Sequence, residues 1–207
     1  MNSKSTIVEH PEEYFRQWTP ERDPLLLGLE EEARREEIPI IGPVAGTLLA
    51  VLTVAVRATK VLELGTAIGY SAIFLGRACK PCGGQVMTVD NDPAMAARAR
   101  VNLRKTELTE TVSVREGEAL RLLPEIPGPF DLVFMDIDKE QYAPALGQCE
   151  RLLRPGGLLA VDNTAFPESD AFNRALADSP AWHSVQLYSF LPLHSPEKDG
   201  FCLALRL

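Results

Sequence analysis

The apolar positions of the chain follow a helical period before about residue 60. LLLGLEEEARREE, within the acidic first forty residues, gathers its leucines on one side and predicts an amphipathic helix. Pro39 and the Gly42–Pro43 pair break that helix. The next segment, about 44–59, is apolar almost all round, so it predicts a second helix that is buried.

From about residue 60 onward, short apolar runs alternate with helical patterns. The predicted strands are KVLELG, QVMTVD, VSVREG, FDLVFMD and LLAVDN, and the helical patterns are SAIFLGRAC, PAMAARARVNLRKTE, KEQYAPALGQCERLL (stopped by RPGG) and SDAFNRALAD. This alternation predicts βαβ units and a mostly parallel sheet, and near-continuous apolar strands are typical of strands covered on both faces. HSVQLYSFL and FCLALRL have no helix between them, which predicts a closing antiparallel hairpin.

Composition and charge narrow the class of partner. The 207 residues are 45% hydrophobic and 24% charged, which fits one domain with at most a small appendage. A net charge of −8 disfavours nonspecific electrostatic binding to nucleic acid. With no apolar run long enough for a membrane span and no apolar signal core, we expect a cytoplasmic protein without membrane contact. Cys79 and Cys82, in CKPC, are expected to be reduced loop thiols rather than a redox or zinc motif.

Every predicted parallel strand ends in a polar group. The first ends in ELGTAIGYS, and the next four end at Asp90, Glu118, Asp136 and Asp162–Asn163. Helix capping could explain one such group, but hardly all of them. Because ligands of open α/β sheets bind outside the carboxyl ends of the strands, these groups together predict a ligand site.

The glycine turn after the first strand distinguishes between cofactors. Ala67 stands where a dinucleotide fingerprint needs its second glycine, which disfavours a nicotinamide dehydrogenase. Glu63, two places before Gly65, suits an ammonium group, and Ser71 at the next helix start suits a carboxylate. Asp90 suits a ribose diol. An amino acid joined to a nucleoside is S-adenosylmethionine, which is the predicted cofactor.

Two carboxylates should converge at the ends of the fourth and fifth strands. Neighbouring strands lie roughly 5 Å apart. Asp136 and Asp162 would then need a cation between them or a shared proton. Together with the Asn163 amide they form an all-oxygen set, which favours a hard divalent cation: magnesium first, with calcium or manganese as alternatives. The remaining alternative is that Asp162–Asn163 only caps the next helix.

Four motifs resemble one known family. VLELGTAIGYSA, TVDNDPAMAARA, FDLVFMDIDKEQY and LLRPGGLLAVDN resemble, in order and spacing, the cation-dependent O-methyltransferases of the catechol and caffeoyl-coenzyme A type. The resemblance implies an N-terminal helical extension, 1–38, and an S-adenosylmethionine-dependent methyltransferase domain, 39–207. It also implies a doubly wound, Rossmann-like α/β fold with helices on both faces of a seven-stranded sheet whose last strand is antiparallel.

The resemblance also assigns site residues by matching position. The cofactor-binding set it implies is Ile41, Glu63, Gly65, Gly69, Ser71, Asp90, Glu118, Ala119 and Asp136. In that set Glu63 would meet the methionine amino group, Ser71 its carboxylate, Asp90 the ribose, Glu118 and the Ala119 backbone the adenine, and Ile41 the cofactor and acceptor pocket. The implied metal ligands are Asp136, Asp162 and Asn163, and the implied catalytic residues are Lys139 and Asp136. A small catechol or vicinal diol would chelate the cation, and Lys139 would take the proton of the attacking hydroxyl.

Departures from the family pattern leave the acceptor open. The segment after Asn163 is short, the loop LPLHSPEKDG is long, and Ile137 and Asp138 stand where catechol enzymes have larger rings. Phe166, His194 or the N-terminal helix could close the pocket.

His194 is expected to be a loop residue rather than a catalyst, and Asp138 could orient Lys139, cap a helix or touch the acceptor. Alternatives are the same chemistry on a hydroxylated tRNA base, and a non-catalytic S-adenosylmethionine-binding module. The two N-terminal helices could support a homodimer.

Overall fold

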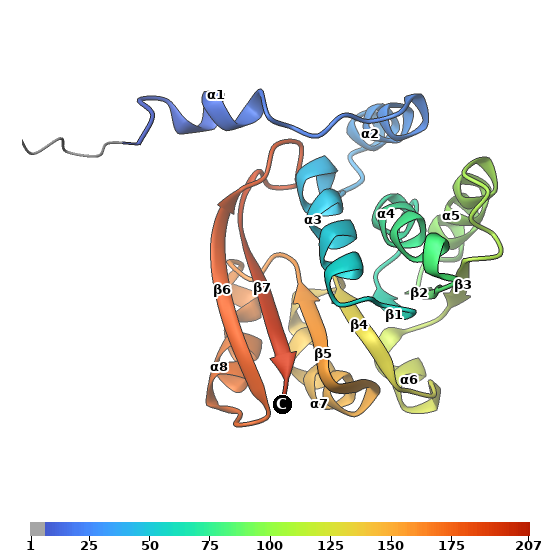
Figure 1. The fold of residues 1–207 in the computed structure, drawn as a ribbon, viewed down its shortest axis with the longest axis vertical. Helices are drawn as coiled ribbons and strands as arrows, with labels where there is room; N and C mark the ends of the chain where they lie inside the picture. Colours follow the sequence, from blue (N-terminus) through green and yellow to red (C-terminus); the bar gives the residue numbers. More distant parts are fainter. Residues whose placement is uncertain (1–6) are drawn as a thin grey trace, which may run out of the picture.

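A seven-stranded sheet forms the centre of the computed structural model, which describes residues 7–207 (Figure 1). The strands are β1 (Lys60–Leu64), β2 (Gln85–Asp90), β3 (Val112–Glu116), β4 (Phe130–Met135), β5 (Leu153–Val161), β6 (Trp182–Phe190) and β7 (Lys198–Arg206). Their order is β3-β2-β1-β4-β5-β7-β6. β1 to β5 pair in parallel, whereas β7 is antiparallel to both β5 and β6. The predicted fold class and its closing hairpin are confirmed.

Helices cover the sheet on both faces, which explains the continuous apolar strands. The helices are α1 (Pro11–Arg16), α2 (Pro24–Glu36), α3 (Gly42–Ala55), α4 (Tyr70–Cys79), α5 (Pro93–Lys105), α6 (Ala119–Leu122), α7 (Tyr142–Leu152) and α8 (Asp170–Asp178). Along β4, Leu132 and Phe134 enter the core cluster beneath α2, α3 and α4. Val133 and Met135 enter the cluster beneath α6, α7 and α8. Alternate side chains of one strand therefore fill two separate cores.

The predicted amphipathic N-terminal helix is α2, and it belongs to the main core. Asp23 caps it by accepting a hydrogen bond from the Leu26 N–H at 3.0 Å. Leu26, Leu29 and Ala33 are buried in the same cluster as α3 and α4. The helix therefore packs as part of the fold, and the domain boundary at residue 38 stays a prediction.

Two local features differ from the expected pattern. The helix predicted before RPGG is α7, and it ends at Leu152 as expected, but the strand β5 begins at Leu153 and runs through the glycines, earlier than the predicted strand LLAVDN. The pairing with β4 shifts register between Phe130 and Leu132, which accommodates this irregular start. The four-residue helix α6 was not predicted, because it is too short to carry a helical period.

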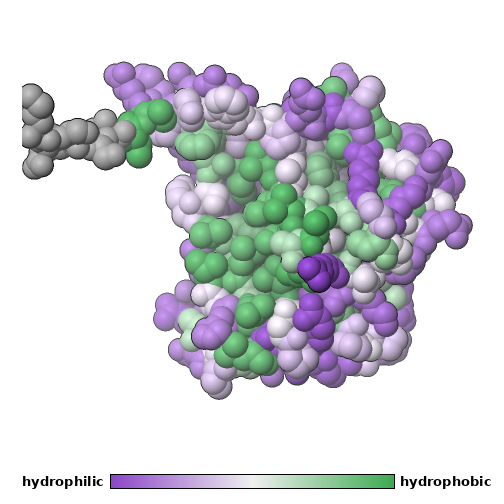
Figure 2. All heavy atoms as spheres, in the orientation of Figure 1, coloured by the Kyte–Doolittle hydropathy of each residue, from purple (hydrophilic) through white to green (hydrophobic). Residues whose placement is uncertain are grey.

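One surface of the molecule is apolar (Figure 2). It lies where α3 runs beside the β6–β7 hairpin in the same view as Figure 1. The exposed apolar side chains of these elements include Val51, Val54, Val185, Leu187 and Leu205. None of the helices described between residues 7 and 207 is long and apolar enough to cross a membrane.

Candidate active site

A cavity of about 260 Å³ opens at the carboxyl ends of the central strands. The strand order reverses between β1 and β4, so the loops after them diverge and leave a crevice. The predicted site residues that line it are Ile41, Gly65, Ser71, Asp90, Glu118, Ala119, Asp136, Lys139, Asp162 and Asn163. Glu63 and Gly69 lie outside this lining. The structure thus gathers all but two of the predicted residues around one cavity.

The glycine loop after β1 is fixed by backbone geometry. Gly65 has a φ of +98°, and a Cβ there would lie 1.9 Å from the carbonyl oxygen of Asp136. Asp90 Oδ2 accepts hydrogen bonds from the N–H groups of Thr66 at 2.9 Å and Ala67 at 2.7 Å. Asp90 Oδ1 accepts one from the Asp92 N–H at 2.9 Å. Asp90 therefore pins the loop to β2, a structural role in addition to the predicted ribose contact.

Ser71 lies in the first turn of α4, whose N-terminus faces the cavity. Gly69, with a φ of +85°, precedes the helix, and no side chain caps it. The first-turn N–H groups are therefore available to an anionic group. Tyr70 also lines the cavity, and its hydroxyl donates to the buried Glu30 of α2 at 2.7 Å. Sequence reasoning did not predict Tyr70 as a site residue, because no sequence pattern indicates a hydrogen bond to a residue 40 positions away.

Glu63 lies fully buried at the end of β1. Neither of its carboxylate oxygens has a hydrogen-bond partner in the described part of the chain. Burial raises the pKa of Glu63 to about 8, and the neighbouring Ser71 and Thr88 hydroxyls, without completing a well-formed hydrogen bond, offset only part of that rise. A buried carboxyl in this state would gain most from a nearby cationic group.

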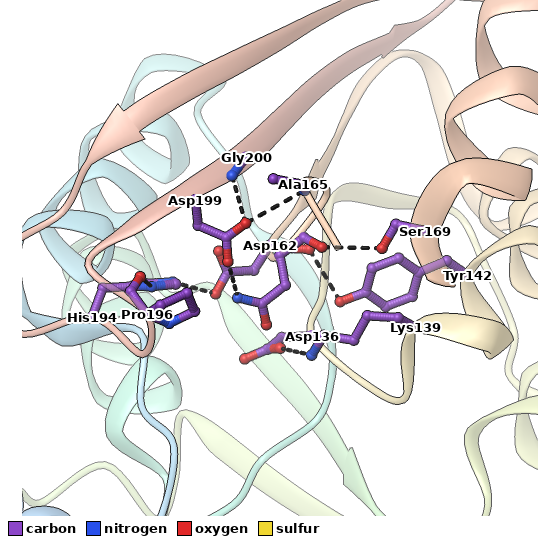
Figure 3. Close-up of polar contacts among 11 residues, drawn as sticks. Asp136, Lys139, Tyr142, Asp162, Ala165, Ser169, His194, Pro196, Asp199 and Gly200 are labelled. Carbon is purple, nitrogen blue, oxygen red and sulfur yellow. Dashed lines mark hydrogen bonds and ion pairs between the residues drawn. The ribbon is translucent and has the colours of Figure 1, made fainter. Parts of the chain in front are cut away.

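Asp136 and Lys139 both line the cavity and lie next to each other (Figure 3). Lys139 Nζ is 3.3 Å from Asp136 Oδ1 and 5.9 Å from the ring centroids of Tyr142 and Phe166. Enclosure by protein and then the charge of Asp162 raise the pKa of Asp136 to about 6, although Lys139 opposes the rise. The carboxylates of Asp136 and Asp162 and the ammonium group of Lys139 thus lie close together in the lining of the cavity.

Asp162 and Asn163, at the end of β5, are held by His194 of the β6–β7 loop and by Asp199 at the start of β7, respectively. Asp162 Oδ2 lies 2.7 Å from His194 Nε2, while its buried Oδ1 has no hydrogen-bond partner among the described residues. Asn163 Nδ2 donates to the buried Asp199 at 2.6 Å. These bonds leave Asp162 Oδ1 and the amide oxygen of Asn163 as the free oxygens.

His194 was expected to be a loop residue rather than a catalyst, and it does lie in the loop. Its ring, however, is buried and bonds Asp162 from 32 positions away in the sequence. Leu191 and Pro192 of that loop are also buried. An apolar start to a connecting loop was therefore the one available signal that it folds inward.

Asp138 lines the cavity but remains exposed. Its carboxylate accepts a hydrogen bond from Gln141 Nε2 at 3.2 Å and makes no helix-capping bond. Within residues 7–207, no three His, Cys, Asp or Glu side chains converge to hold a metal ion. A cation here would therefore depend on the Asn163 amide as its third protein ligand.

Comparison with known proteins identifies the family. Residues 20–176 match the family model described as O-methyltransferase. The chain belongs to this family. The enzyme is 40% identical over 196 residues to a catechol O-methyltransferase of Mycobacterium tuberculosis, covering 88% of this chain and 89% of the relative. A catechol O-methyltransferase of Niastella koreensis is 36% identical over 163 residues, covering 76% and 73%.

A solved structure agrees with this assignment of the O-methyltransferase. The enzyme superposes with a TM-score of 0.84 on the O-methyltransferase from Bacillus cereus in complex with SAH, at 27% identity and covering 95% of this chain and 97% of that one. The family, the fold and the enzyme class predicted from the sequence are confirmed.

Proposed function

We propose that this O-methyltransferase moves the methyl group of S-adenosylmethionine to a hydroxyl of a small catechol-like or vicinal-diol molecule, with a divalent cation bound beside it. Its relatives include catechol O-methyltransferases, and a structural neighbour was crystallised with SAH. The net charge of −8 argues against the alternative acceptor, a hydroxylated tRNA base.

The cofactor half of the cavity suits S-adenosylmethionine. Free N–H groups at the start of α4, together with Ser71, can hold the carboxylate of the methionine part. The orphaned Glu63 carboxyl, buried beside Ser71, would stabilise its ammonium group. Asp90 and Glu118 line the cavity where the ribose and adenine would lie, and Ile41 would close it from the α3 side.

The observation that carries the cation is the buried Asp162 Oδ1, which has no hydrogen-bond partner in the described chain. Asp136 lines the same cavity and raises the local negative charge. The Asn163 amide oxygen is left free because its nitrogen bonds Asp199. Two carboxylates and one amide oxygen fit a hard cation such as magnesium, with manganese or calcium as alternatives.

The cation ligands and Lys139 have separate roles in the proposed reaction. A cation at Asp136, Asp162 and Asn163 would act as a Lewis acid that lowers the pKa of a neighbouring acceptor hydroxyl. Lys139 Nζ, once deprotonated, takes the hydroxyl proton, and its contact with Asp136 keeps it at the cavity wall. The acceptor oxygen then attacks the sulfonium methyl group. Most of the rate enhancement comes from holding two substrates in line.

A methyl-transfer assay tests the proposal. We expect purified enzyme, S-adenosylmethionine, magnesium and a catechol to yield methylated product. EDTA and the D136A variant should each lower the rate at least about 100-fold, and so should K139A, as expected for loss of a general base. D178A, which removes an exposed carboxylate at the end of α8, is the matched control. Transfer that survives both EDTA and D136A would remove the cation from the mechanism.

We further propose that two copies pair through the apolar surface of α3 and the β6–β7 hairpin. Val54 is 62% exposed and Leu187 39% exposed on this surface, and contiguous apolar patches commonly mark interfaces. Sedimentation should give a dimer for the wild type and a monomer for V54E/L187E. A monomeric wild type would contradict the pairing. The cytoplasmic location stays a prediction.

A further inference from the structure

His194 is a buried titratable side chain beside the site that the mechanism above does not use. It sits in the β6–β7 loop, and its side chain is 1% exposed. Nε2 lies 2.7 Å from Asp162 Oδ2 and Nδ1 lies 2.5 Å from the Pro196 carbonyl oxygen. In Figure 3 the ring lies on the far side of Asp162 from Tyr142. Both ring nitrogens are therefore occupied by protein acceptors, and neither is free to bind a cation.

The partners of the ring define its hydrogen-bonding direction. A carbonyl oxygen can only accept, so Nδ1 must carry a hydrogen and donate it to Pro196. The contact between Nε2 and Asp162 Oδ2 then holds one proton between an imidazole nitrogen and a carboxylate oxygen. This contact occupies Oδ2 and leaves Oδ1 alone to face the cavity.

The loop that carries the ring is itself fixed. A Cβ on Gly42, at the start of α3, would lie 2.7 Å from the carbonyl carbon of Leu193, so the two backbones touch there. The His194 N–H donates to the Leu191 carbonyl at 3.0 Å, and the Leu193 N–H donates to Glu197 at 2.9 Å. These contacts fix the loop backbone, and the two bonds of the ring to Asp162 and Pro196 fix the ring itself.

We propose that His194 is a positioning residue, which holds Asp162 so that a single oxygen, Oδ1, is presented to the divalent cation. This inference rests on the proposed function, because it needs a cation at Asp162. Groups that orient metal ligands through hydrogen bonds typically change metal affinity 10- to 100-fold when they are removed.

The experiment measures manganese binding to the full-length protein by calorimetry, without methyl transfer. We expect H194A to bind manganese about 10- to 100-fold more weakly than the wild type. H194Q should stay within about threefold, because the glutamine amide can still donate to Asp162. H183A, which removes an exposed histidine of β6, is the matched control and should bind as the wild type does.

The outcomes separate the two proposals. A wild type that does not bind manganese would remove both the cation and the role of His194. Binding by the wild type that H194A keeps unchanged, or strengthens, would remove only the role of His194. If H194A binds manganese more tightly than the wild type, the His194 ring acts only as a positive charge that competes with the cation for Asp162.

A second measurement needs no destabilised variant. The chain has three histidines, so His194 resonances can be assigned by elimination with H10A and H183A. Magnesium added to the wild type should shift the His194 ring signals, with half of the shift reached near the dissociation constant that calorimetry gives for magnesium. Ring signals that do not move at saturating magnesium would overturn the proposal.

Discussion

The two halves of the cavity are held by different means. In the cofactor half, Asp90 is bonded by backbone N–H groups of the adjacent glycine loop, and both elements follow consecutive strands. In the half with the proposed cation site, called the cation half below, Asp162 and Asn163 are held by side chains 32 and 36 positions away, on the β6–β7 loop and at the start of β7. Backbone geometry therefore shapes one half, and long-range side-chain contacts shape the other.

The unpaired oxygens also differ between the halves. Among the described residues, both oxygens of Glu63 lack hydrogen-bond partners in the cofactor half, whereas only Oδ1 of Asp162 lacks one in the cation half. Leaving a buried carboxylate unsatisfied is costly, so each marks where a cationic ligand would gain most. The cofactor half would gain from an ammonium group, and the cation half from an ion that takes one oxygen.

Gly65, in the glycine loop of the cofactor half, packs against the backbone of Asp136 in the cation half. Its substitution should have the largest effect on stability. In G65A the new Cβ would lie 1.9 Å from the Asp136 carbonyl oxygen, at a φ of +98°. Because backbone must move on both sides, we expect the free energy of unfolding to fall by more than about 4 kcal/mol. Chemical denaturation would measure this.

Gly28 provides the matched control for Gly65. It lies exposed in α2, and no atom of residues 7–207 would lie within 4 Å of an added Cβ. G28A should stabilise the protein by about 0.5–1 kcal/mol, since alanine favours a helix interior. A G65A protein as stable as the wild type would show that the two halves do not meet rigidly at this residue.

The pH dependence of stability should isolate Glu63 in the cofactor half. Its folded pKa of about 8 exceeds the usual value of 4.5, so the folded state holds a proton that the unfolded state releases between these values. Stability is therefore lost as pH rises through that window. We expect E63Q to unfold with a free energy a few kcal/mol higher than the wild type at pH 8, on the order of 1.4 kcal/mol per pH unit crossed.

Thermal unfolding across pH supplies the internal control for E63Q. The two proteins should converge in stability near pH 4.5, where the wild-type carboxyl is protonated in the folded state. Parallel curves for E63Q and wild type from pH 4.5 to 8 would show that Glu63 does not hold a proton in the fold.

In the cation half, Asp199 should matter for stability and for cation binding together. It accepts hydrogen bonds from Asn163 Nδ2 and from the Gly200 N–H, both at 2.6 Å. D199A should lower the free energy of unfolding by about 2 kcal/mol, because buried donors lose their acceptor. It should also weaken manganese binding about tenfold, because the Asn163 amide is then free to turn.

The design of the Asp199 test separates orientation from folding. In D199N the amide oxygen can still accept from the Gly200 N–H. The amide NH2 group would then face the Asn163 NH2 group, and two donors cannot bond each other. Stability near that of the wild type with weakened manganese binding would support an orienting role. Unchanged manganese affinity in a folded D199A protein would contradict it.

Sequence reasoning predicted the cofactor half better than the cation half, for a physical reason. Strand ends, the glycine turn and Asp90 are local features, and parallel strands bring their ends together by topology alone. The partners of Asp162 and Asn163 come from the β6–β7 loop and the start of β7, whose positions beside β5 depend on tertiary packing. His194 and Asp199 thus lay beyond what spacing could predict, and α6 was too short to carry a period.

The smallest expected effect concerns how α1 is attached to the β6–β7 loop. The Arg16 guanidinium donates to both carboxylate oxygens of Glu197 at 2.8 and 2.6 Å, and this lowers the pKa of Glu197 to about 2. The pair is solvent-exposed and screened by water, so R16A should leave the free energy of unfolding nearly unchanged. Its contribution is present above pH 4.5 and disappears as the pH falls toward 2.

Glu197→Ala should cost more than R16A, because Glu197 also accepts the Leu193 N–H beside His194. We expect E197A to lower stability by about 1–2 kcal/mol and to weaken manganese binding slightly, whereas R16A should leave manganese binding unchanged. Calorimetry on both variants at the same pH makes the comparison. Equal weakening of manganese binding by the two variants would mean that the contact with α1, rather than the hydrogen bond to the Leu193 N–H, holds the loop beside Asp162.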